Sequence, residues 1–216
     1  MKRGLTLGAE INSLGEKWTG WTALHHAADA GQVEVVKFLL DQGADLDRIS
    51  LDYAAHTALH LAVSKRHYEV VSVLLAGGAD PDLYTATGCC GTALHLASAL
   101  ADLRLCRDLL ARGAQAGAVS EEGSSVLHYL AVSQTPEALE VVKLLLENGS
   151  DQLDINAVDW DGYTALMRSE SERAQDYKNN IAGQLQWEIM ELWSICSVEE
   201  QISASRNQTM RKMLRK

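Results

Sequence analysis

A seven-residue motif returns along the chain at a nearly constant interval, and this repetition constrains the fold more than any other feature. The motif reads TALHHAA from Thr22 and recurs as TALHLAV from Thr57, TALHLAS from Thr92, SVLHYLA from Ser125 and TALMRSE from Thr164. A glycine closes the second apolar stretch of each copy, and Gly43, Gly78 and Gly113 are again 35 residues apart. Two landmarks that share one period of this size predict an array of small repeated units.

The residue types within one copy indicate how it folds. Thr at the start can cap a helix by accepting from free backbone N–H groups. Val35, Val36, Leu39 and Leu40 then fall at helical spacing, which predicts a buried stripe on a second helix. We expect a left-handed turn at the glycines that end the second helices, namely Gly43, Gly78, Gly113 and Gly149. Two short antiparallel helices and a loop cannot bury an apolar face alone, so the units must stack.

These motifs resemble the ankyrin repeat family. The repeated motif stands where that family has its T-P-L-H-x-A-A signature, and VEVVKFLLDQGAD from Val33 matches the family's second helix and glycine turn. The resemblance covers about residues 5–168, although Ala or Val replaces Pro, Arg66 and Ala101 replace a turn Gly, and the pattern degenerates after Met167. It implies an all-α, ankyrin-type solenoid of helix-turn-helix repeats, with loop or β-hairpin fingers and a C-terminal capping helix.

The same landmarks predict where the units begin and end. Residues 1–16 match the tail of a preceding repeat, so we expect a fragment or short isoform of a longer array. The array is expected over 17–168, with units at about 17–51, 52–86, 87–119 and 120–158 and a degenerate unit at 159–182. Apolar residues at helical spacing predict a capping helix over 183–198. The basic tail at 199–216 is interpreted as a solvated terminus, with a nuclear-localisation or anionic-surface contact as the alternative.

Recurring histidines raise the question of a metal site. His25, His60, His95 and His128 lie one repeat apart, so stacking should separate neighbours by about 10 Å. A zinc site needs its ligand nitrogens about 2 Å from one ion, so these four cannot share a metal. We therefore interpret each imidazole as a structural group that links its own loop to the next by hydrogen bonds. The acidic stretch DINAVDWDG from Asp154 lacks the calcium-loop pattern and is likewise interpreted as structural.

Composition and missing motifs narrow the functional classes. A formal net charge of −10 argues against nucleic acid as the main partner, and no segment approaches the length of about 20 apolar residues that a membrane span needs. The four cysteines show no C-x-x-C pair, and we interpret them as free thiols, with a redox role for Cys89 and Cys90 as the minor alternative. Hydrolase, nucleotide-binding and metalloprotease signatures are missing. We expect neither catalysis nor a cofactor.

Candidate binding residues lie just before each capping Thr or Ser, where an ankyrin-like unit has its projecting loop tip. Trp and Tyr are enriched among interface hot spots, and core packing does not require them at such tips. The alternative is that these aromatic rings pack against neighbouring loops. First-helix ends add polar residues on the same concave side. The predicted protein-binding residues are Trp18, Trp21, Asp29, Tyr53, His56, Lys65, Glu121, Trp160 and Tyr163.

The sequence therefore predicts a non-catalytic protein-protein interaction module, acting as a scaffold, adaptor or inhibitor, that binds a protein through its concave face. We expect a monomer in the cytoplasm, with the nucleus as a second location. The competing hypothesis is a structural segment or short isoform of a longer multi-domain ankyrin protein whose function lies outside this chain.

Overall fold

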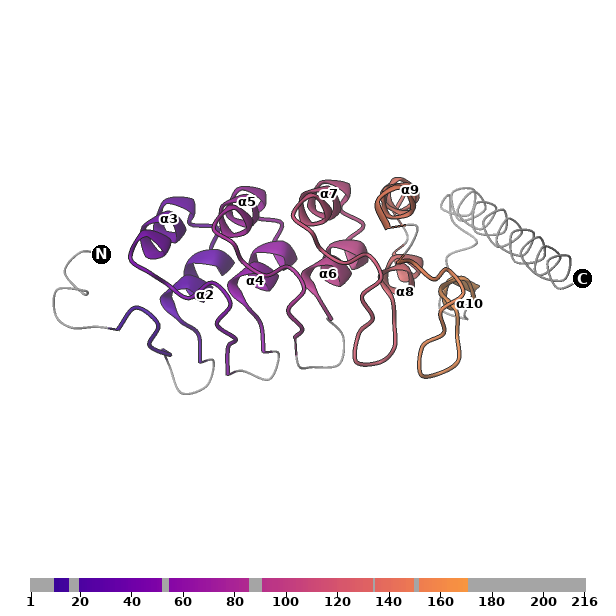
Figure 1. Cartoon of the computed structure of the whole chain (residues 1–216), viewed down its shortest axis with the longest axis horizontal. Coiled ribbons are helices and arrows are strands. Elements are labelled where there is room, and N and C mark those ends of the chain that lie inside the picture. The colour runs from indigo at the N-terminus through magenta and orange to yellow at the C-terminus, as the bar shows by residue number, and fades with distance from the viewer. Residues whose placement is uncertain are drawn as a thin grey trace, which may run out of the picture.

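A computed structural model describes residues 10–15, 20–51, 55–85, 91–133, 135–149 and 152–170. Within these residues the helices form two layers that run side by side along the long axis of the molecule (Figure 1). The first helix of each unit lies in one layer: α2 (Ala23–Asp29), α4 (Ala58–Ser64), α6 (Ala93–Ala99), α8 (Val126–Val132) and α10 (Ala165–Glu170). The second helices form the other layer: α3 (Val33–Asp41), α5 (Tyr68–Ala76), α7 (Leu103–Ala111) and α9 (Glu137–Gly149). The predicted stack of helix-turn-helix units is confirmed.

Loops connect each second helix to the next first helix and project beyond the first-helix layer as fingers (Figure 1). Two fingers close with a single antiparallel bridge each, Val119 with Ser125 and Val158 with Thr164. The predicted capping helix over 183–198, the tail at 199–216 and the later part of the degenerate unit lie outside the described residues.

Four first helices, α2, α4, α6 and α8, begin with a reciprocal cap between a Thr or Ser and a His. In the first unit the His25 backbone N–H donates to the Thr22 hydroxyl oxygen at 3.5 Å. The Thr22 backbone N–H in turn donates to His25 Nδ1 at 3.1 Å. An imidazole nitrogen that accepts carries no proton, so Nε2 must carry it in the neutral ring. The cap therefore sets the tautomer, and it recurs at His60, His95 and His128.

The protonated Nε2 atom of three of these histidines donates to the next finger. His25 reaches the His56 carbonyl at 3.0 Å, His95 the Ser124 carbonyl at 3.2 Å and His128 the Tyr163 carbonyl at 3.0 Å. His60 differs, since its buried Nε2 atom has no hydrogen-bond partner among the described residues. Burial is the largest cause that lowers the pKa of His60 and of His95 to about 4.

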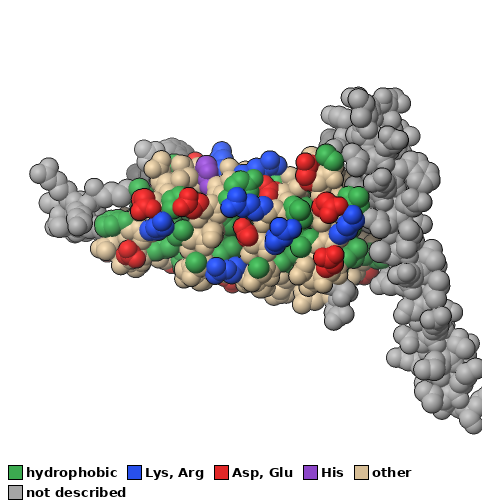
Figure 2. Space-filling view, turned by 90° about the horizontal axis from the view of Figure 1, so that it is seen from above, with side chains coloured by type: hydrophobic (Ala, Val, Ile, Leu, Met, Phe, Trp, Pro, Cys, Tyr) green, Lys and Arg blue, Asp and Glu red, His purple; other side chains and the backbone are tan. Residues whose placement is uncertain are grey.

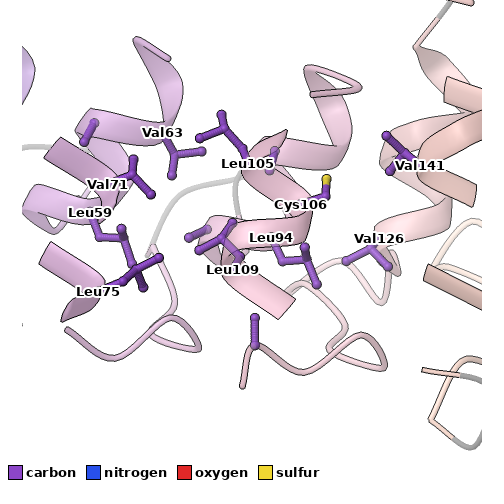
Figure 3. Close-up of a cluster of buried hydrophobic side chains, with 14 of the residues drawn as sticks. Leu59, Val63, Val71, Leu75, Leu94, Leu105, Cys106, Leu109, Val126 and Val141 are labelled. Carbon is purple, nitrogen blue, oxygen red and sulfur yellow. The ribbon is translucent and has the colours of Figure 1, made fainter. Parts of the chain in front are cut away.

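The core is continuous from unit to unit. Leu59, Val71 and Leu75 of one unit face a cluster that includes Leu94 and Leu109 of the next (Figure 3). Alanines at the first-helix positions, such as Ala28, Ala62 and Ala97, are fully buried, so neighbouring helices can approach closely. A single unit would expose this apolar surface to water, so the units must stack, as the motif predicted.

Glycine at the end of the second helix behaves as predicted in three of four cases. Gly43, Gly78 and Gly113 have φ of +82°, +95° and +91°, the left-handed region in which a side chain is strained. The prediction for Gly149 is wrong, because this residue is the last residue of α9 and its φ is not positive. A Cβ atom at Gly149 would lie 2.4 Å from Ala116 Cβ, so glycine is needed there for close packing.

A ladder of side-chain hydrogen bonds joins the loops that follow these glycines. Asn12 accepts from the Asp45 N–H at 2.8 Å, Asp47 from the Asp80 N–H at 3.0 Å and Asp82 from the Gln115 N–H at 2.9 Å. Each bond joins residues 33 apart. The D-x-D pattern after the glycine turn thus has a structural function, because its second acidic residue ties one unit to the next.

Candidate protein-binding face

The structure places the C-terminal pair of predicted aromatic residues on one finger and leaves both accessible. Trp160 is 79% exposed, and its indole lies against Gly123 of the preceding finger, where an added Cβ would come within 2.9 Å of the ring. Tyr163 is 47% exposed, with the Arg168 guanidinium 5.6 Å above its ring. Glu121, at the tip of the preceding finger, is also exposed.

Asp159 and Arg168 hold that finger in shape. Asp159 is buried and accepts from the backbone N–H groups of Asp161 and Tyr163, both at 3.0 Å. Arg168 Nε donates to the same carboxylate, and Arg168 Nη2 donates to Asp161 at 2.9 Å. Burial would raise the pKa of Asp159, but the bonds from Arg168 and from the Tyr163 N–H outweigh it and leave that pKa below its usual range. The acidic stretch DINAVDWDG therefore shapes its own loop.

The N-terminal candidates are less accessible. Trp21 is half-buried, with its ring 5.1 Å from that of His26 and 6.4 Å from that of His25. His56 is half-buried too, and its ring lies 6.2 Å from that of His60. These ring contacts are with the first helix of the same unit, α2 or α4, and not with a neighbouring loop. Trp18 and Tyr53 lie outside the described residues.

The polar candidates on the first-helix ends come together across two units. The Lys65 ammonium lies 3.9 Å from the Asp29 carboxylate, and both side chains remain substantially exposed. Such a pair contributes on the order of 1 kcal/mol or less to stability. It is therefore available to a partner at little cost.

A row of apolar side chains at one repeat position was missed by the sequence reasoning. These residues directly precede the buried polar residue at the base of each finger, and we call them the finger row: Ile49, Tyr84, Val119 and Val158. Their exposed fractions are 41%, 42%, 47% and 56%. The first three are spaced by 35 residues, so the period contained the signal, but the residue type varies and the inspection of loop tips passed over it.

A groove deepens the same face near its C-terminal end. It has a volume of about 290 Å³ and lies between fingers and first helices, with walls that include Ala99 of α6, Tyr129 and Val132 of α8, and Arg168 of α10. Val132 is 64% exposed, whereas the equivalent first-helix positions hold Asp29, Ser64 and Ala99. Finger and first helix thus share one concave surface here.

The comparisons with known proteins agree with this architecture. A family model described as "Ankyrin repeats (3 copies)" matches residues 3–85 and 94–179. The chain belongs to the ankyrin repeat family. A search of curated proteins found no match. Ankyrin repeats are generally protein-protein interaction modules and are typically non-enzymatic.

The second-helix layer of this ankyrin array offers a different surface. Figure 2 shows acidic and basic side chains interspersed with apolar ones across the face above α3, α5, α7 and α9. Some of these charges pair within their own helix, as in Lys37 with Glu34 at 2.8 Å and Lys143 with Glu140 at 2.9 Å. Mixed and internally paired charge is typical of a solvated surface, whereas the finger row presents unpaired apolar area.

The described residues contain no group of three His, Cys, Asp or Glu side chains placed to hold a metal ion. Cys106 is fully buried, and burial raises the pKa of its thiol to about 12, which makes it a poor nucleophile. Cys89 and Cys90 lie outside the described residues. No helix in the described part of the chain is long and apolar enough to cross a membrane.

Proposed function

We propose that this ankyrin array is a non-catalytic module that binds a protein partner through the face formed by its fingers and first helices. The observation that supports this most directly is the finger row, in which one repeat position carries an exposed Ile, Tyr or Val in four successive units. Exposed apolar residues that are scattered singly are ordinary, whereas apolar residues gathered on one face mark an interaction site. The repetition of this position supports such a gathering, because equivalent residues of stacked units lie in equivalent places.

The rigid core beneath the row supports the same function. Each finger base is held by a buried polar residue, such as Ser50, Thr85 or Ser120, and by the bonds from the histidines below. A partner therefore meets side chains whose backbone is already ordered. Less conformational entropy is lost on binding, which improves affinity for a given contact area.

The test uses a photo-crosslinking amino acid at two positions of the same unit. Tyr84 lies in the finger row, whereas Ser72 is exposed on α5 in the opposite layer. With p-benzoylphenylalanine at position 84 we expect a discrete adduct with a protein from cell extract, identified by mass spectrometry, and no such adduct from position 72. Adducts from position 72 alone would assign binding to the second-helix layer. A lack of adducts from both would favour a structural segment of a longer protein.

A further inference from the structure

The groove between α6, α8 and α10 combines apolar walls with unpaired acidic charge. Tyr129 and Val132 supply the apolar surface, and Glu122 lies at its finger side. The Glu122 side chain is exposed and forms no ion pair with any other described residue. The neighbouring Glu121 side chain is also exposed and also forms no ion pair with another described residue.

The other polar groups of the groove are already engaged. Arg168 donates to both Asp159 and Asp161, so its positive charge is balanced by two carboxylates. His128 uses Nδ1 in its helix cap and Nε2 on the Tyr163 carbonyl. The charged side chains that line the groove are Glu122 and Arg168, and of these only Glu122 lacks a counter-ion among the described residues.

This excess of negative charge favours a cation over an anion. An aromatic ring lies next to this part of the finger: the Trp160 backbone N–H donates to the Glu122 carbonyl at 3.0 Å, and the exposed indole lies against Gly123, the residue after Glu122. A cation at Glu122 would meet a carboxylate, and the neighbouring finger carries an exposed indole; both groups attract cations in proteins.

We propose, on the basis of the protein-binding function above, that this groove receives an Arg or Lys side chain from the partner. The aliphatic stem of that residue packs along Tyr129 and Val132, while its charged end meets Glu122 beside Trp160. Long basic side chains bury their methylene groups in this way and keep the charge near polar groups. An acidic segment would be repelled, so the partner sequence carries a basic residue next to an apolar one.

The proposal can be tested with two defined peptides and the full chain labelled with ¹⁵N. Acetyl-Leu-Arg-Leu-amide carries the charge, and acetyl-Leu-citrulline-Leu-amide has the same shape without it. We expect the arginine peptide to shift the amide signals of Tyr129 and Val132 and the indole signal of Trp160, and to bind at least fivefold more tightly than the citrulline peptide. Equal affinity for the two peptides would overturn the proposal without requiring any variant.

Glu122→Gln should weaken the arginine peptide at least fivefold and leave the citrulline peptide unchanged. The matched control is Glu69→Gln, an exposed residue of α5 two units away, which should change neither affinity. If Glu122→Gln binds the arginine peptide as the wild type does, the assigned contact is wrong. Crosslinking from Tyr84 is independent of this groove, so its success would uphold the binding face even if the basic side chain is not recognised.

Discussion

The middle of the array and its C-terminal end share one repeat but differ in the side-chain interactions that hold their loops. In the middle, Asp47 and Asp82 each bond to the backbone of the following unit, and the first-helix ends carry Ser64 and Ala99. At the C-terminal end the residue equivalent to those acidic residues is Gly117, and the ladder stops there. A separate clamp from Arg168 to Asp159 and Asp161 holds the last described finger instead.

The exposed apolar residues follow this division only in part, since Leu51 of the regular part of the array is 71% exposed. Val132, Trp160 and Met167, the last of which stands where earlier units have a buried histidine, are all more than half exposed. In units that keep the repeat pattern, the equivalent side chains form hydrogen bonds to the next unit or are buried between units. Units that depart from it release side chains to the surface, and it is there that the groove forms. If the proposed function is right, we expect the partner to contact this end of the described array.

The largest predicted effect concerns the buried imidazoles of the middle units. The pKa of His60 and of His95 is about 4 in the folded chain, against about 6.5 in an unfolded one. The unfolded state therefore gains protons first as the pH falls, so stability is intact above pH 6.5 and is lost progressively towards pH 4. Each imidazole should account for roughly 3 kcal/mol of that loss.

Urea unfolding at a series of pH values between 7 and 4 measures this loss. His95→Gln removes one of the two titrations, so that variant should lose less stability over the interval than the wild type does. His26→Gln, at an exposed histidine, is the matched control substitution. A wild-type stability that is flat over this range would show that these rings accept protons in the folded state.

Leu74→Ala tests the core of the middle units. Leu74 is fully buried on α5, and removing it leaves a cavity between helices, so unfolding should become easier by about 2 to 5 kcal/mol. Leu51→Ala is the matched control, because Leu51 is 71% exposed and its loss should change stability by about 0.5 kcal/mol at most. Thermal or urea unfolding of the two variants measures the difference. Equal stability would contradict a continuous core.

Much of this organisation could be predicted from the sequence because a period is a strong physical constraint. The capping Thr or Ser and His of four units and the glycines at 43, 78 and 113 each have the same local function from unit to unit, so one unit predicts the others, except that His60 lacks the bond to the next finger. The exceptions arise where a contact between units decides the outcome. Gly149 looked like another turn glycine, but Ala116 of the preceding unit packs against it, and no local pattern encodes that contact.

The binding face was less predictable than the fold. Trp160 and Tyr163 were identified because large aromatic residues on a loop are conspicuous, and the structure leaves both exposed. Trp21 was chosen on the same grounds, yet its ring packs on His26. The finger row escaped because Ile49 or Val119 alone is unremarkable, and only the structure shows that these positions face outward together. Side-chain direction in a loop depends on the finger base, which sequence inspection could not place.

Gly117→Ala tests why the ladder stops. A Cβ atom at Gly117 would lie 2.3 Å from the Gln152 carbonyl oxygen, so backbone must move, and we expect a loss of about 1 to 3 kcal/mol. Gly77→Ala is the control, since φ of Gly77 is −74° and the closest contacts of an added Cβ, both at 3.3 Å, are the end of the Leu40 side chain and the Leu74 carbonyl oxygen. That variant should change stability by about 0.5 kcal/mol or less. If both variants behave alike in denaturant, the missing acidic residue at 117 has another cause.

The smallest effect on stability should come from Trp160→Ala, and for that reason it separates function from folding most clearly. The indole contacts Gly123 but buries little of its own surface, so the free energy of unfolding should change by about 0.5 kcal/mol or less. Partner capture should nevertheless fall at least tenfold, because an exposed Trp beside the groove is the residue type that dominates interface energetics.

Tyr84→Ala offers the comparison within the finger row: it too should leave stability unchanged but weaken capture less, since Tyr84 stands in the regular part of the array. If Trp160→Ala unfolds the chain, the ring is a structural member of the finger. If the two variants weaken capture equally, the partner contacts the whole finger row, and the C-terminal end contributes no more to binding than the middle does.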